Sequence, residues 1–192
     1  MPPVRRGQRA IIRAGRASGF AGVWAAWSSE ITPWSDAVSD ALKVGEPAPE
    51  VSLVSDTGET VSLSDFKDRQ AVVLYFYPKD DTPGCTKEAC SFRDLSAEFA
   101  AKGAVILGVS PDTTKSHVKF RDKFGLPFPL LSDPGAEVAQ RFGIWVEKTH
   151  YGRKYMGVER TTVVIGKDGT VKKVFPKVSV DGHVEDVLAA LD

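Results

Sequence analysis

The clearest feature of the hydrophobic pattern is an unbroken apolar run over residues 71–77. Its length and its β-branched and aromatic residues are typical of a strand that is buried on both faces. A second apolar run of strand length follows at residues 104–109. Between the two runs, Cys85, Phe92 and Phe99 recur at intervals of seven, which predicts one helix with a core-facing stripe. Strand, helix and strand at this spacing predict a parallel pair joined by a right-handed crossover.

Turn residues between short apolar segments predict two β-hairpins, over residues 51–63 and 161–175. Helical spacing and end signals predict three more helices, around residues 118–124, 136–142 and 184–191. Residues 145–155 are rich in aromatic and basic side chains, and we expect a loop there that either edges a substrate or partner surface or packs as an ordinary loop. Together these elements predict an α/β protein with a central mixed sheet flanked by helices and an N-terminal β-hairpin.

Both cysteines of the chain lie at the start of the helix that follows the first core strand. Thr82 is a suitable N-cap and Pro83 suits the first helical position, so Cys85 falls in the first turn. A thiol there faces backbone N–H groups that have no partner within the helix, which favours the thiolate form. Asp80 and Asp81 would oppose a thiolate if they lie close to the sulfur, so the site would need a cation from elsewhere in the chain.

Cys90 lies five residues after Cys85. In a helix, positions i and i+5 are separated by about 8–9 Å between Cα atoms, with side chains about 140° apart. A disulfide needs Cα atoms within about 7 Å. Either the two thiols never pair, in which case Cys90 is a small buried apolar residue, or they pair after the first turns of the helix unwind.

The motif Pro-x-x-x-Thr-x-x-Cys at Pro78, Thr82 and Cys85 is followed by Cys90 and, much later, by Glu-Arg-Thr-Thr at residues 159–162. This combination resembles the peroxiredoxins, and within them the bacterioferritin-comigratory or Q-type subgroup. The resemblance covers the chain from about residue 43 to the C-terminus. It implies a thioredoxin-like fold and a thiol-dependent peroxidase, an antioxidant enzyme that reduces hydrogen peroxide and organic hydroperoxides.

The resemblance also implies the role of each motif residue. Cys85 would attack the peroxide and become a sulfenic acid, which Cys90 would resolve as an intramolecular disulfide. Pro78 would shield the site, while Thr82 and Arg160 would hold the thiolate and the peroxide. The chemistry favours Arg160, because peroxide attack needs donors aimed at the oxygens and a guanidinium can hold two partners at once. A thioredoxin-type reductant, a monomer and the absence of any metal or organic cofactor are further implications.

Charge and composition divide the chain unevenly. The 192 residues carry 25 basic and 25 acidic side chains, and five arginines precede the first acidic residue, Glu30. Without those five, the rest of the chain has 20 basic and 25 acidic residues, a net charge of −5. This charge balance argues against nucleic acid as a binding partner. No stretch of the sequence approaches the length of about 20 apolar residues that a membrane span needs.

We expect residues 1–40 to be a disordered basic leader, a targeting segment or an overlong start assignment, and residues 43–192 to form the peroxiredoxin domain. A cytoplasmic location suits a transient catalytic cysteine pair, and export or an organelle is the alternative if the leader is a targeting segment.

Two other functional classes stay open on the sequence. A thiol–disulfide exchange protein would normally carry Cys-x-x-Cys, whereas four residues separate Cys85 from Cys90. A non-catalytic peroxide sensor or redox-regulated binding protein would carry the same residues as the enzyme. The three histidines, His117, His150 and His183, share no metal-ligand spacing with the cysteines, which argues against zinc.

Overall fold

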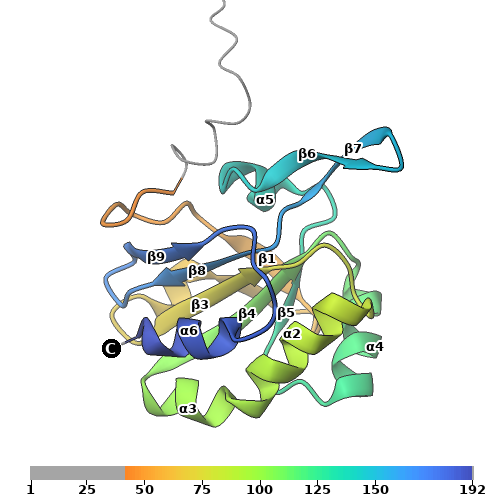
Figure 1. Ribbon diagram of the computed structural model, residues 1–192. Coiled ribbons are helices and arrows are strands. Elements are labelled where there is room, and N and C mark those ends of the chain that lie inside the picture. Colours follow the sequence, from red (N-terminus) through yellow and green to blue (C-terminus); the bar gives the residue numbers. More distant parts are fainter. Residues whose placement is uncertain (1–41, 192) are drawn as a thin grey trace, which may run out of the picture. The chain divides into compact units, whose positions relative to one another are not determined.

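The computed structural model describes residues 42–191, so the predicted leader lies outside the described residues (Figure 1). In chain order the elements are β1 (Ser52–Ser55), β2 (Thr60–Ser62), the 3₁₀ helix η1 (Leu63–Phe66), β3 (Ala71–Phe76), α2 (Pro83–Asp94), α3 (Ser96–Ala101), β4 (Ala104–Ser110), α4 (Thr114–Phe124), β5 (Leu130–Ser132), α5 (Glu137–Arg141), β6 (Trp145–His150), β7 (Arg153–Val158), β8 (Thr161–Ile165), β9 (Val171–Phe175) and α6 (His183–Ala189).

The main sheet is mixed, as predicted, and has the strand order β2-β1-β5-β4-β3-β8-β9. The predicted parallel pairing of the two core strands, β3 and β4, is confirmed, and β4 and β5 also pair in parallel. The remaining pairs of this sheet are antiparallel, and they include both predicted hairpins, β1–β2 and β8–β9. Strand β3 therefore lies inside the sheet, which accounts for its continuous apolar sequence.

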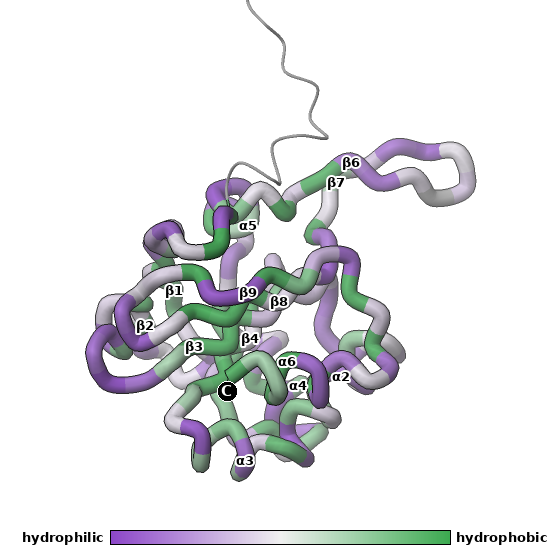
Figure 2. The backbone as a smooth tube through the Cα atoms, turned by 60° about the vertical axis from the view of Figure 1, so that its left-hand side comes forward, coloured by the Kyte–Doolittle hydropathy of each residue, from purple (hydrophilic) through white to green (hydrophobic). Residues whose placement is uncertain are grey.

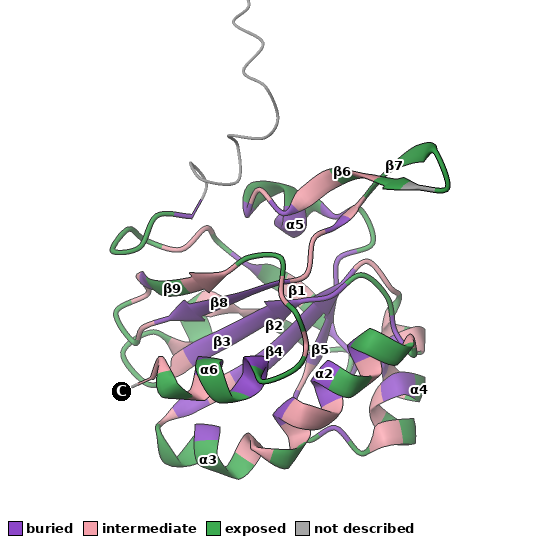
Figure 3. Cartoon of the chain, in the orientation of Figure 1, coloured by how far each residue is buried: buried purple, intermediate pink, exposed green. Residues whose placement is uncertain are grey.

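The core has two layers, one on each face of the main sheet, and β3 contributes to both. Figure 3 shows this strand buried along most of its length. Its residues Val72, Leu74 and Phe76 pack in one layer together with α5. The alternate residues Val73 and Tyr75 pack in the other layer, which α2, α3, α4 and α6 cover. Figure 2 colours much of the central strands as hydrophobic. Because Cys85 and Phe92 belong to the second layer, the core-facing stripe of the first helix is confirmed.

The single helix expected after β3 is two helices. Helix α2 ends at Asp94 and α3 begins at Ser96, with Leu95 between them. The Ser96 hydroxyl donates a hydrogen bond to the carbonyl oxygen of Arg93 over 2.7 Å. A serine side chain that bonds to the backbone competes with the helical pattern, which explains the break.

The prediction of a loop at residues 145–155 is wrong, because these residues fall within a second, two-stranded sheet formed by β6 and β7. The hairpin forms because Tyr151 and Gly152 both take positive φ, 48° and 75°, as a tight primed turn requires. Strand β5 is also unpredicted, since its three residues lie between prolines and turn signals. The helix predicted around residues 118–124 is α4: Thr113 Oγ1 accepts from the Ser116 N–H at its start, and Gly125 closes it in the left-handed region.

Helices long and apolar enough for a membrane span are absent from residues 42–191.

Candidate active site

The site is built where β3 leads into α2. Thr82 occupies the predicted N-cap position of α2, with extended backbone angles of −95° and 150°. Its hydroxyl makes no capping bond, however, and donates instead to the carbonyl oxygen of Lys79 over 3.0 Å. The N–H groups of Gly84 and Cys85 lie in the first turn, where a helix offers them no acceptor. The start of α2 is therefore open to an anion or a polar ligand.

Cys85 lies in this first turn and is buried, with 1% of its surface exposed. Arg160 Nη2 donates to Cys85 Sγ over 3.2 Å, although the two residues are 75 positions apart in the chain. The sheet explains the approach, because Thr161 pairs with Phe76 at the end of β3 and so brings Arg160 beside the active-site loop. A guanidinium at this distance stabilises a thiolate over a thiol.

Arg160 has a second partner that the sequence interpretation missed. Its Nη1 donates to the Oε2 of Glu88, which lies on α2 one turn after Cys85 and is fully buried. Burial raises the pKa of Glu88 to about 7, although the charge and hydrogen bond of Arg160 act in the opposite direction. Within residues 42–191, Glu88 Oε1 has no hydrogen-bond partner. One guanidinium thus bridges the reactive sulfur and a buried acid.

Asp80 and Asp81 both have side-chain partners on α4. Asp80 is buried and contacts His117, while Asp81 forms an exposed ion pair with Lys123 at 2.6 Å. The Lys123 cation reduces the repulsion expected between Asp81 and a thiolate. Arg160 contacts Cys85 and Glu88.

The other predicted site residues lie around this centre in different ways. Pro78 is exposed at the start of the loop that leads to α2. Cys90 is half-buried further along the intact α2, and both thiols are unpaired. Gly84 gives Arg160 its space, since a Cβ atom at this position would lie 3.3 Å from Arg160 Nη2. The structure therefore brings Cys85 and Arg160 together and keeps Cys90 on the same unbroken helix.

Metal ligands do not gather here: residues 42–191 hold no group of three or more His, Cys, Asp and Glu side chains that could bind an ion.

The fold and this centre define a class of protein, the thiol-based oxidoreductases with a reactive cysteine at a helix N-terminus. Residues 44–174 match the AhpC/TSA family. The chain is 49% identical over 150 residues to peroxiredoxin Bcp of Bacillus subtilis, which covers 78% of this chain and 95% of that protein. The chain belongs to the AhpC/TSA family and, within it, to the Bcp/PrxQ peroxiredoxins.

Solved structures agree with this assignment. The bacterioferritin comigratory protein of Xanthomonas campestris, described with its alkyl peroxide reduction activity, has a TM-score of 0.70 and 42% identity, over 73% of this chain and 89% of that one. A cysteine-to-serine variant of PrxQ from Xylella fastidiosa has a TM-score of 0.74 and 38% identity. The match covers 78% of this chain and 95% of that one. The predicted thioredoxin-like fold and thiol-dependent peroxidase activity are confirmed, and a separate exchange or sensor function is not favoured.

Proposed function

We propose that Cys85 is the peroxide-reactive residue of this peroxidase, and the observation that carries the proposal is its contact with Arg160. The Cys85 thiolate attacks one peroxide oxygen, an S–O bond forms and the O–O bond breaks. The sulfur becomes a sulfenic acid, and the other oxygen leaves as water or an alcohol after taking a proton. Arg160, the Thr82 hydroxyl and the open N–H groups of α2 stabilise the charge that develops on the oxygens. Pro78 restricts solvent access to the site.

Cys90 completes the cycle by resolving the sulfenic acid. Its thiol attacks Cys85, a disulfide forms and water leaves. Because positions i and i+5 of a helix lie about 8–9 Å apart, α2 must unwind over its first turns before the sulfurs meet. Half-burial of Cys90 supports this role, since a thiol near the surface is released by a local opening.

A thioredoxin-type dithiol then reduces the Cys85–Cys90 disulfide and returns both thiols. Hydrogen peroxide and organic hydroperoxides are the substrates, in line with the alkyl peroxide activity described for the Xanthomonas relative. Residues 43–192 act as one catalytic domain, a monomer in the cytoplasm, where a transient disulfide is readily reduced. If residues 1–40 are a targeting segment, the protein is exported or delivered to an organelle instead.

The test is steady-state peroxide consumption with thioredoxin, thioredoxin reductase and NADPH. The wild-type protein should turn over many times, and Cys85→Ser should be inactive. Turnover by Cys85→Ser at the wild-type rate would exclude the proposed role of this thiol. Consumption of one equivalent of peroxide by the wild type, with no further turnover, would instead favour a sensor.

A further inference from the structure

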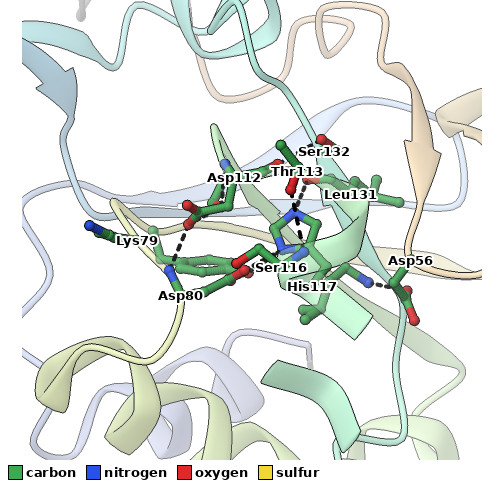
Figure 4. Close-up of polar contacts among 12 residues, drawn as sticks. Asp56, Lys79, Asp80, Asp112, Thr113, Ser116, His117, Leu131 and Ser132 are labelled. Atoms are coloured by element: carbon green, nitrogen blue, oxygen red, sulfur yellow. Dashed lines mark hydrogen bonds and ion pairs between the residues drawn. The ribbon is translucent and has the colours of Figure 1, made fainter. Parts of the chain in front are cut away.

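Beside the active-site loop, the structure buries a charged pair that the reaction steps above do not use (Figure 4). His117 Nδ1 lies 2.9 Å from Asp80 Oδ2, and His117 Nε2 lies 3.2 Å from the carbonyl oxygen of Leu131. A carboxylate and a carbonyl oxygen accept hydrogen bonds only, so each ring nitrogen of His117 lies beside an acceptor. The side chains of His117 and Asp80 are 0% and 4% exposed.

Other hydrogen bonds keep Asp80 in its carboxylate form. Tyr77 Oη donates to Asp80 Oδ1 over 2.7 Å. Burial raises the pKa of Asp80, but hydrogen bonds from His117, Ser116 and Tyr77 outweigh it and lower the pKa below its usual value. A buried ion pair stabilises a fold only when its geometry is good and its remaining hydrogen bonds are satisfied, and this pair meets both conditions.

The pair ties the active-site loop to elements other than α2. Asp80 lies between β3 and α2, whereas His117 lies on α4 and reaches Leu131 on β5. The backbone N–H of Asp80 adds a third tie, because it donates over 2.7 Å to Oδ2 of Asp112, in the β4–α4 connection. None of these three ties has a partner on α2, since the partners belong to β5, α4 and that connection.

The chain turns into α2 immediately after this anchor. Asp81 has a φ of 53°, in the left-handed region that a residue with a side chain seldom adopts. Its carboxylate is held by Lys123 on α4, and the Thr82 hydroxyl bonds back to the carbonyl oxygen of Lys79. The fixed position of Asp80 therefore determines where Thr82 and the first turn of α2 begin.

We propose that the Asp80–His117 ion pair is a positioning device for the peroxide step. It holds the loop of residues 78–82 so that Thr82 and Cys85 face Arg160 in the reduced enzyme. It also keeps this loop on α4 while α2 unwinds, so that the site re-forms after each reduction. Both residues act through the loop rather than by touching the peroxide, and the inference rests on the proposed function.

The test compares two reactions of the Cys85 thiol by stopped flow. In His117→Gln, we expect oxidation by hydrogen peroxide to slow on the order of 10- to 100-fold, because the groups around the peroxide lose their alignment. Alkylation by iodoacetamide needs no such alignment and should keep its wild-type rate. Adding Asp80→Asn to His117→Gln should slow the oxidation of Cys85 little further, because the two residues act as one pair. Ile165→Ala, which truncates a buried side chain in the other core layer, is the control for lost stability and should leave oxidation unchanged.

Several outcomes would overturn the positioning role. One is oxidation of His117→Gln at the wild-type rate. Another is alkylation of His117→Gln that slows as much as its oxidation. The third is oxidation of Ile165→Ala that slows as much as that of His117→Gln. If His117→Gln does not fold, Asp80→Asn alone serves as the second variant, with the same selective loss expected. Wild-type protein that reacts with peroxide as slowly as a free thiol would contradict the proposed function itself, which separates the two failures.

Discussion

Arg160 donates from Nη2 to Cys85 Sγ over 3.2 Å and from Nη1 to the buried carboxylate of Glu88. The contact depends on the sheet, because Thr161 pairs with Phe76 and carries Arg160 to the start of α2. One guanidinium therefore couples the charge of the reactive sulfur to that of a buried acid. The sulfur, the guanidinium and the acid should respond together to substitution.

Arg160→Lys keeps the positive charge but loses the planar fork, so the amine cannot hold Cys85 and Glu88 in the same way. We expect the rate of Cys85 oxidation by hydrogen peroxide to fall on the order of 100- to 1,000-fold, as measured by stopped flow. Arg153→Lys, at an exposed arginine on β7, is the matched control and should oxidise at the wild-type rate. Wild-type oxidation by Arg160→Lys would show that charge alone is sufficient.

Glu88 should make the stability of the fold depend on pH in an unusual direction. Its pKa rises from 4.5 to about 7 on folding, chiefly through burial, so the folded state retains a proton that the unfolded chain releases. This contribution is complete below pH 4.5 and is lost as the pH rises through about 7.

Glu88→Gln removes the titration and keeps the side-chain shape. Between about pH 5 and pH 8, we expect the free energy of unfolding of the wild type, relative to Glu88→Gln, to fall on the order of 3 kcal/mol. Urea unfolding at both pH values measures this difference. A difference that does not change with pH would mean that Glu88 titrates normally in the folded protein.

Tyr75 and Tyr77 offer a matched pair of core substitutions. The hydroxyl of Tyr75 is buried and has no hydrogen-bond partner among residues 42–191, whereas that of Tyr77 donates to Asp80 over 2.7 Å. Tyr75→Phe should therefore increase the free energy of unfolding by about 1 kcal/mol, and Tyr77→Phe should decrease it by about 1–3 kcal/mol. Thermal and urea unfolding measure both, and changes of the same sign would contradict this explanation.

Cys90→Ser should separate oxidation from resolution. The Cys85 thiol should still react once with peroxide at the wild-type rate, but thioredoxin should not restore it efficiently. With excess peroxide the sulfenic acid should advance to the sulfinic form, because no thiol captures it. Mass spectrometry of the Cys85 peptide follows these states, and sustained thioredoxin-dependent turnover by Cys90→Ser would exclude Cys90 as the resolving residue.

The parts of the site that the sequence predicted are local ones. Strand β3, the N-cap at Thr82 and the place of Cys85 in the first turn follow from neighbouring residues, so they could be predicted from pattern and helix end signals. Glu88 was within reach of the same reasoning, because it lies three positions after Cys85 on the same helix face. The hairpin of β6 and β7 could have been predicted from Tyr151 and Gly152 at a tight turn.

Other parts depend on contacts between distant segments. Arg160 was predicted only by resemblance, since the pairing of β8 with β3 brings it to Cys85 from 75 positions away. His117 carries no local signal, and its partner Asp80 lies 37 positions earlier. Such pairs are set by the packing of α4 on the sheet rather than by periodicity.

The most direct test of the central claim is a stopped-flow titration of the reduced protein with one equivalent of hydrogen peroxide, followed by peptide mapping without reductant. We expect rapid loss of both thiols and an intramolecular bond between Cys85 and Cys90. That result requires α2 to unwind, because the intact helix holds the two residues too far apart. Oxidation as slow as that of a free thiol, or rapid oxidation without this bond, would contradict the account.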